Sequence, residues 1–344
     1  MTDSDNAPAS GKSKLVLIVI AVLLLVTLPF VPWLASGLRQ SSVEGAVVAA
    51  GGRASYGKRL FEEGDYVTDE KKQGKSFVGD LFGDAFVENL TQVEIRKPIK
   101  DRSVLAKVAR LRHLEILDVS SSDVTDQDLE LLRNSEGLKK LWVNSCSITD
   151  AGMNSLSDLP TLMSLGIDDT TIGDAAMDSI STHANLKRLY MANSKVTDAG
   201  VSKLAGHGAL LGIGLEGTQV TDQVMDHLAM IPTLKEVRLA KTGISDAGAS
   251  KLGSLEMLQS VNLADTKLTA AGLGWLADAK ELEIVDISGT SVEDDIVDIL
   301  IAMPKLVSVS LRNTGVSGEA ITRLKRQKRG ATVQYDEERL NIGR

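Results

Sequence analysis

Aliphatic residues recur at a fixed interval of 24 positions along most of the chain. A second aliphatic residue follows each leucine of this series by three positions, and a third follows two positions later, as in Leu186, Leu189 and Met191. A period of roughly 20–29 residues with this spacing is typical of stacked units that each contain a short strand and a helix. The units begin at Leu90, Leu114, Leu138, Leu162, Leu186, Leu210, Leu234, Leu258, Leu282 and Leu306.

Each unit predicts a strand followed by a helix. The second and third aliphatic residues alternate with polar ones, which predicts a short strand with one buried face. A small polar residue such as Ser194 follows, and then the pair Thr197-Asp198, which favours the start of a helix. Val201 and Leu204 continue at helical spacing. One unit cannot bury its own apolar face, so we expect neighbouring units to stack, with a parallel sheet on the concave side and short helices on the convex side.

The segments LKKLWVNSCSITDAGMNSL and LKRLYMANSKVTDAGVSKL resemble leucine-rich repeats. Their I/V-T-D-x-G form resembles the subtype of bacterial repeat proteins and of F-box substrate receptors. The resemblance covers about Leu90 to Leu324 and implies an α/β solenoid. The preceding segments, AVVAAGGRASYGKRL and FVGDLFGDAFVENLTQVEI, resemble the N-terminal region of bacterial membrane-anchored leucine-rich repeat proteins. The chain departs from the repeat pattern at Pro98, Lys100, Ala270 and Gly318.

An uncharged run of 21 residues, Leu15–Ala35, predicts a transmembrane helix, because about 20 residues span the hydrocarbon core of a bilayer. A cleaved signal peptide is the alternative, since residues 35–37 are small, but its apolar region is usually only about 7–15 residues long. Lys12 and Lys14 favour a cytoplasmic N-terminus. We therefore expect a single-pass membrane protein whose repeat domain is extracytoplasmic.

These patterns divide the chain into five parts. Gly330 stands one period after Leu306, and an aliphatic and an aromatic residue then fall in the two strand positions, so we expect a closing strand at 331–335. The parts are a short tail at 1–14, the transmembrane helix at 15–35, a linker and N-terminal capping segment at 36–89, the 24-residue repeats at 90–329, and a C-terminal cap strand and tail at 330–344.

Composition excludes several classes of function. The chain has 38 Lys and Arg against 46 Asp and Glu, a formal net charge of −8, whereas nucleic-acid binding is driven by clustered positive charge. The single cysteine, Cys146, stands in the small polar position of its unit, where a structural role is expected. His183 and His207 are one period apart without a third recurring ligand, and we expect both to be exposed. The recurring Asp residues start helices and lack the spacing of calcium-binding solenoids. We therefore predict no enzyme, no cofactor and no metal site.

The concave face offers a candidate binding site. Trp142, Gly166 and Tyr190 occupy one outward column on three consecutive units, and exposed aromatic side chains on a rigid sheet are typical interface anchors. Strands about 4.8 Å apart place the aromatic pair about 10 Å apart, across a glycine floor that we expect to form a shallow apolar slot. The candidate ligand-binding residues are Trp142, Tyr190, Lys140, Arg188, Asn144, Asp168 and Arg238.

Charge on this face is mixed, with six acidic and five basic outward positions, which favours a protein or peptide ligand over a polyanion. The alternative, that ligands bind elsewhere or not at all, stays open. Two functions compete. The first is a non-catalytic, membrane-tethered scaffold that binds protein through its concave face. The second is an intracellular substrate-recognition adaptor resembling F-box receptors, which would need a helical docking domain that the short, Gly-rich segment 36–89 does not resemble.

Overall fold

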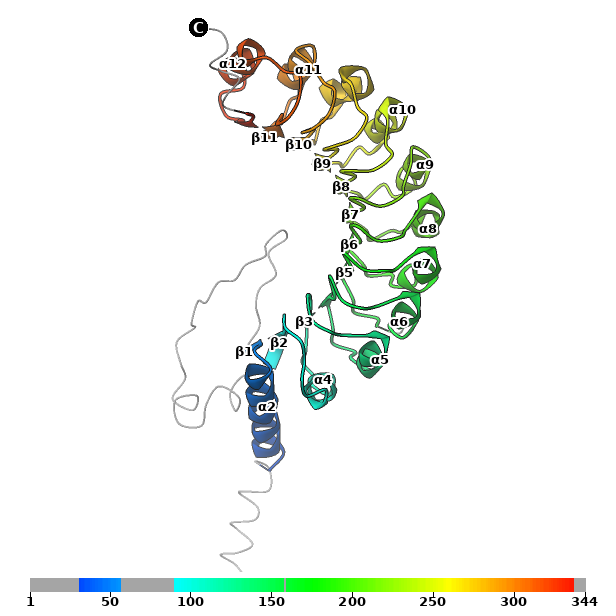
Figure 1. Cartoon of the computed structure of the whole chain (residues 1–344), viewed down its shortest axis with the longest axis vertical. Coiled ribbons are helices and arrows are strands. Elements are labelled where there is room, and N and C mark those ends of the chain that lie inside the picture. Colours follow the sequence, from blue (N-terminus) through cyan, green and yellow to red (C-terminus); the bar gives the residue numbers. More distant parts are fainter. Residues whose placement is uncertain (1–30, 57–89, 158, 337–344) are drawn as a thin grey trace, which may run out of the picture.

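The computed structural model describes residues 31–56, 90–157 and 159–336, with side chains from residue 38 onward. Figure 1 shows a curved stack of coils, one per 24-residue unit, with strands on the concave side and helices on the convex side. The predicted α/β solenoid is therefore confirmed. The strands are β1 (Arg53–Tyr56), β2 (Leu90–Glu94), β3 (Ile116–Asp118), β4 (Lys140–Trp142), β5 (Ser164–Gly166), β6 (Arg188–Tyr190), β7 (Gly212–Gly214), β8 (Glu236–Arg238), β9 (Ser260–Asn262), β10 (Ile284–Asp286), β11 (Ser308–Ser310) and β12 (Thr332–Gln334).

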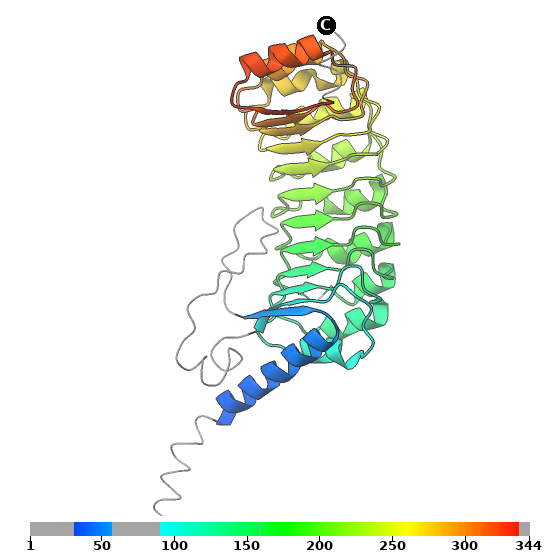
Figure 2. The same cartoon turned by 60° about the vertical axis from the view of Figure 1, so that its left-hand side comes forward.

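The twelve strands of the described residues form one sheet in chain order. From β2 onward the pairs are parallel and join residues 24 positions apart, as in Trp142 opposite Gly166, whereas β1 pairs antiparallel with β2. Because every coil contributes the same register, a given position of the unit forms a column across the sheet. Figure 2 shows the strands stacked side by side from a second side. The last strand, β12, lies within the closing strand expected at 331–335.

Short helices return the chain on the convex side. Four coils combine a short α-helix with a 3-10 turn, and the others have a single α-helix or, in one coil, a 3-10 helix alone. The helical elements are α2 (Val31–Ala49), α4 (Ser103–Val108), α5 (Asp126–Leu129), η3 (Glu130–Leu132), α6 (Asp150–Asn154), η4 (Asp174–Ala176), α7 (Met177–Ile180), α8 (Asp198–Val201), η5 (Ser202–Leu204), α9 (Val224–Leu228), α10 (Asp246–Ala249), η6 (Ser250–Ser254), η7 (Ala270–Asp278), α11 (Ile296–Ala302) and α12 (Gly318–Gln327).

The core lies between sheet and helices and consists of the predicted aliphatic columns. Leu186, Leu189 and Met191 of one coil are fully buried, and the equivalent residues of the neighbouring coils are buried in the same way. Val201 and Leu204 close this coil from the helical side. Each coil thus buries its apolar face against the next, as the repeat pattern predicts.

A recurring aspartate joins most of the coils to the next one. Asp198 Oδ1 accepts a hydrogen bond from the backbone N–H of Thr221 at 2.9 Å, and its Oδ2 accepts one from the Thr221 hydroxyl at 2.6 Å. We call this arrangement the Asp clasp. It explains the glycine of the T-D-x-G pattern, because a Cβ on Gly200 would overlap the carboxylate of Asp174. The same two bonds join Asp126 to Thr149, Asp174 to Thr197, Asp222 to Ser245, Asp246 to Thr269 and Asp294 to Ser317.

The clasp adds to the predicted role of these residues. Helical elements begin at five of the recurring aspartates, as in α6, α8 and α10, whereas α9 and α11 begin two residues after theirs. Thr149, Thr197 and Thr269 accept the capping bond from the backbone N–H two residues on. The clasp is missing at one of the breaks in the repeat pattern. Ala270 stands in the position of the aspartate and has no carboxylate, and Glu293 stands in the position where the next coil would supply Thr or Ser.

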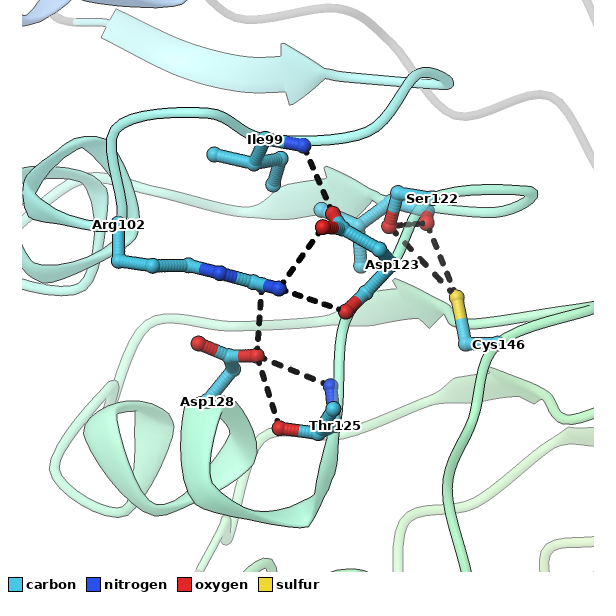
Figure 3. Close-up of polar contacts among 8 residues, drawn as sticks. Ile99, Arg102, Ser122, Asp123, Thr125, Asp128 and Cys146 are labelled. Carbon is cyan, nitrogen blue, oxygen red and sulfur yellow. Dashed lines mark hydrogen bonds and ion pairs between the residues drawn. The ribbon is translucent and has the colours of Figure 1, made fainter.

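The first coil replaces the clasp with an arginine (Figure 3). Arg102 occupies the position of the recurring aspartate and bonds the carboxylates of Asp123 and Asp128 at 2.9 and 2.8 Å. Asp128 also accepts bonds from the N–H and hydroxyl of Thr125, and Asp123 accepts one from the N–H of Ile99. Three of these residues come from the second coil, so the opening unit is joined to its neighbour by ion pairs instead of the recurring bonds.

The N-terminal end is covered by α2 and β1. Val43 and Val47 of α2 are buried against the first coil, and Gln40 Oε1 accepts a hydrogen bond from the backbone N–H of Leu90 at 2.7 Å. The helix runs across the boundary expected at residues 35 and 36. Residues 15–30 of the predicted transmembrane segment lie outside the described residues, and none of the helices that are described is both long and apolar enough to cross a bilayer.

Candidate functional site

The centre of the concave face alternates between large residues and glycine. Trp142, Tyr190 and Arg238 lie in one column on β4, β6 and β8, and Gly166 and Gly214 lie between them on β5 and β7. Their neighbours along each strand belong to the buried core, so this column points to the concave side. In this part of the surface a large residue therefore returns on every second coil, whereas in the core the same aliphatic positions return on every coil.

The two aromatic rings lean together over the first glycine. Their centroids are 6.0 Å apart and their planes differ by 23°, a stacked arrangement. A Cβ on Gly166 would overlap the Trp142 ring, so the ring occupies the space that a side chain at this position would take. The expected apolar slot between the rings is therefore wrong: the strands are two spacings apart, but the missing Cβ lets Trp142 fill the gap.

Tyr190 and Arg238 continue the stack toward the C-terminal coils. Tyr190 Cδ1 lies 2.9 Å from an ideal Cβ on Gly214, and the Arg238 guanidinium carbon lies 5.0 Å from the Tyr190 centroid. Arg238 Nε donates to Glu236 Oε1 at 2.5 Å, which holds the guanidinium in place. A cation over an aromatic face is stabilised by the ring quadrupole. We call the half-buried series Trp142, Tyr190 and Arg238 the ridge.

A basic edge borders the ridge where the strands begin. Lys140 and Arg188 are half-buried and lie two coils apart, with the small, buried Ser164 between them. Burial, and after it the positive charge of Arg188, lowers the pKa of Lys140 below its ordinary value. The positive charges of Lys140 and Arg188 therefore repel each other along this edge.

An acidic edge borders the ridge where the strands end. Asp168 and Glu216 are half-buried and lie two coils apart, with Ala192 between them. Burial is the main cause that raises the pKa of both carboxyl groups. One oxygen of Asp168 accepts a hydrogen bond from the backbone N–H of Ala192 at 2.7 Å, and Asn144 Oδ1 accepts one from the backbone N–H of Asp168 at 3.0 Å. The amide oxygen of Asn144 is therefore occupied by the backbone of the acidic edge, and Asn144 helps to hold that backbone in place.

Comparison with known proteins gives the family. A family model described as "Leucine Rich repeat" matches residues 110–132, 182–205 and 231–253, three separate coils of the solenoid. The chain is a leucine-rich repeat protein. No curated protein sequence matches it.

Solved structures share the fold of this leucine-rich repeat protein. An internalin (inlF) from Listeria monocytogenes is 19% identical, with a TM-score of 0.52 over 73% of this chain and 84% of that one. Internalin C2 (inlC2) from the same organism is 18% identical, with a TM-score of 0.41 over 69% of this chain and 85% of that one. A plant peptide hormone receptor, RGFR1 in complex with RGF2, is 14% identical, with a TM-score of 0.42 over 70% and 46%. The likeness to inlF supports the fold alone.

The seven candidate residues of this leucine-rich repeat protein fall into the groups expected from their columns. The structure brings Trp142, Tyr190 and Arg238 into contact and places the other four on the two edges. Sequence reasoning did not single out Glu216 and Glu236, although both stand in the same outward columns. The sequence did contain the pattern that points to them. Glu216 stands two periods after Asp168, in the same column, and Glu236 lies two residues before Arg238 on the same strand.

The other polar candidates have structural roles. Cys146 is buried, its thiol donates to the carbonyl of Val119 at 3.1 Å, and it contacts the Ser122 hydroxyl (Figure 3). Burial is the main cause that raises the pKa of this thiol. The expected exposure of His183 is wrong: it is 4% exposed, and its ring nitrogens lie 2.8 and 3.1 Å from the Leu156 and Ile180 carbonyl oxygens at the helix ends. Within the described part of the chain, no three His, Cys, Asp or Glu side chains are placed to hold a metal ion.

Proposed function

We propose that this chain is a non-catalytic, membrane-tethered scaffold that binds a protein or peptide through its concave face. The observation that carries the proposal is the ridge. Trp, Tyr and Arg are the residues that most often dominate binding energy at protein interfaces. Here all three are stacked on one another and held on a sheet whose register is fixed by the core beneath, so little conformational entropy is lost when a ligand covers them.

The charges around the ridge support a protein ligand. An interface usually combines an apolar or aromatic centre with a polar rim, and the basic and acidic edges provide such a rim. A polyanion such as nucleic acid would meet the half-buried carboxylates of Asp168 and Glu216 across this face. We therefore place protein or peptide first among the ligand classes.

Membrane tethering rests on the uncharged segment 15–35. The flanking Lys12 and Lys14 favour a cytoplasmic N-terminus, with the repeats on the other side of the membrane. The intracellular adaptor is the less favoured function. It needs a separate docking domain in the segment 36–89, whereas α2 and β1, the described part of that segment, pack onto the first coil.

Two experiments test the proposal. Carbonate extraction and protease treatment of intact cells should leave the chain in the membrane with its repeats accessible from outside; a soluble protein that starts near Leu38 would contradict the anchor. For binding, full-length protein carrying a photo-crosslinker near the ridge should capture a partner whose purified form then binds the wild type. Trp142→Ala should weaken that binding, and Ser308→Ala, on β11 of the same face, should not.

A further inference from the structure

The sheet is finished differently at its two ends. At the first end, β1 adds to β2 in the antiparallel direction, and α2 packs against the first coil. At the other end, β12 pairs with β11, and no described strand adds to its far side. Figure 1 shows α12 of this last coil at the opposite end of the stack from α2. An edge strand presents backbone groups to which another chain can add.

The hydrogen bonds of β12 show which of its backbone groups face outward. Thr332 N–H donates to the Val307 carbonyl oxygen at 2.8 Å. The Gln334 carbonyl oxygen accepts from Leu311 N–H, also at 2.8 Å, so Thr332 and Gln334 both face β11. Successive residues of a strand direct their backbone groups to opposite sides. The N–H and C=O of Val333 therefore point away from β11, and the backbone hydrogen bonds among the described residues include none for them.

The free side of β12 is open where the inner strands are covered. Val309, the equivalent of Val333 on β11, is 0% exposed because β12 lies beside it, whereas Val333 is 9% exposed. Thr332 and Gln334 on either side of Val333 are exposed. The Val333 side chain stays in the aliphatic column, so the core holds the strand in its extended form. A further strand can therefore add without much loss of conformational entropy in β12.

The last coil has an excess of positive charge. Between Leu306 and Asp336 there are six Lys and Arg against two Asp and Glu, whereas the whole chain has a net charge of −8. Arg326 lies in the last turn of α12, and Arg329 lies in the turn that leads into β12. Both are exposed, and the ion pairs among the described residues include neither of them. A chain that adds to β12 therefore meets a positive surface.

We propose that β12 docks an extended acidic segment of a partner protein, which adds to the sheet as a further strand. Backbone hydrogen bonds to Val333 hold the segment in a way that does not depend on its sequence, and Arg326 and Arg329 select for acidic side chains. A second copy of this chain is disfavoured, because pairing of two β12 strands brings two basic coils together. The site lies four strands beyond β8 and is separate from the ridge.

The test measures binding of labelled, end-capped peptides to the full-length chain in detergent micelles. The probes are Ser-Glu-Val-Thr-Val-Glu-Ser and its twin with Lys in place of both Glu. A charge near each end places one beside Arg329 in either strand direction. Fluorescence anisotropy at low salt should show the acidic peptide binding about tenfold more tightly than its basic twin. Equal affinity for the two peptides, or binding of neither, overturns the proposal.

Two substitutions of one residue test strand addition. Val333→Pro removes the outward N–H and keeps the bonds that Thr332 and Gln334 make to β11, whereas Val333→Ala keeps the N–H and shortens the side chain. Affinity for the acidic peptide should fall about tenfold in the Pro variant and stay nearly unchanged in the Ala variant. Melting curves check that both variants fold. Equal affinities of the two variants would show that the peptide does not pair with β12.

A second set of variants tests the charge without altering the strand. Arg326→Gln together with Arg329→Gln should remove the preference for the acidic peptide over its basic twin. Arg110→Gln together with Arg133→Gln, both exposed near the opposite end of the solenoid, is the matched control and should leave the preference intact. An equal effect of the two pairs would mean that the overall charge of the chain, and not this site, selects the peptide.

Other occupants of the edge give different results. A dimer that dissociates in Val333→Pro, seen by sedimentation, would make a second copy the occupant. Tighter binding of both peptides by a chain that ends at Asp336 would make residues 337–344 the occupant. Either result overturns the proposal, and so does loss of peptide binding in Trp142→Ala, which would assign the peptide to the ridge. Failure of the peptide at β12 leaves the proposed function intact, because that function is tested by a Trp142-dependent partner.

Discussion

The interior of the solenoid and its concave face follow different periods. Inside, the same aliphatic positions return on every coil, and each is buried as its neighbours are. On the face, large and small residues alternate from β4 to β8, and beyond β8 the column holds Asn262, Asp286 and Ser310. The buried pattern that specifies the fold is repeated in every coil, whereas the ridge and its edges occur only once. Substitutions in the two regions should therefore affect different properties.

The largest effect is expected in the interior. Leu189→Asp places a carboxylate in a fully buried column of β6, where it has no partner, and this should lower the free energy of unfolding by several kcal/mol. Because stability in a solenoid is a sum of coil and neighbour contributions, hydrogen exchange should rise most in the adjacent coils. Leu189→Met, which keeps volume and polarity, is the matched control. An unchanged melting curve for the Asp variant would mean that inward and outward positions are exchanged.

The Asp clasp should come next in size. Asp198→Ala removes two hydrogen bonds from a carboxylate to Thr221 and should lower the free energy of unfolding by about 2 kcal/mol. Chemical denaturation gives the value. Asp226→Ala, which removes a surface ion pair with Lys251, should cost much less. Equal losses in the two variants would show that the clasp is not a special joint between coils.

The joint between Ala270 and Glu293, which lacks the clasp, allows the opposite experiment. Ala270→Asp together with Glu293→Thr supplies both partners of a clasp where the wild type has neither, and we expect the free energy of unfolding to rise by about 1 kcal/mol. Each single substitution should give less than half of that gain. A double-mutant cycle in chemical denaturation measures the coupling, and additive single effects would contradict the geometry assigned to this joint.

On the face, the expected effect on stability is smaller and depends on pH. Burial holds the pKa of Glu216 above its ordinary value of 4.5, so the folded state binds this proton more tightly than the unfolded state does. The free energy of unfolding contributed by this group therefore falls as the pH rises from the ordinary pKa through the raised one. Glu216→Gln should lack this decrease and gain stability relative to the wild type toward neutral pH. Parallel pH–stability curves for the two proteins would refute the burial assigned to this carboxyl group.

The sequence predicts the fold far better than the shape of the site. The columns of Leu189 and its equivalents follow from periodicity alone, because each coil repeats the same burial. The orientation of the Trp142 ring does not follow from periodicity. It depends on the absence of a Cβ at Gly166, one coil away, and on the ring of Tyr190 on the coil beyond. The burial of His183 depends in the same way on carbonyl groups at the ends of neighbouring helices, which no single unit reveals.

The clasp lies between these cases. Recurring Asp and Thr are visible in the sequence, and they predict most of the helix starts correctly. The partner of each aspartate is the residue 23 positions later, usually a threonine or serine, a relation that becomes evident only when the coils are stacked. The alternation of Trp142, Gly166, Tyr190, Gly214 and Arg238 was equally present in the sequence, and it gains meaning when the side chains are seen to cover the glycines.

The central claim is that the ridge binds while the interior folds, and Trp142→Ala tests it most directly. Trp142 is half-buried by stacking, so its loss should lower the free energy of unfolding by only about 1 kcal/mol. Binding of the captured partner should weaken by about 2 kcal/mol or more, roughly thirtyfold in Kd, while Ser308→Ala leaves both quantities unchanged. Equal, small effects of the two substitutions on binding would contradict the ridge as the site, and unfolding of Trp142→Ala would show that this residue belongs to the fold.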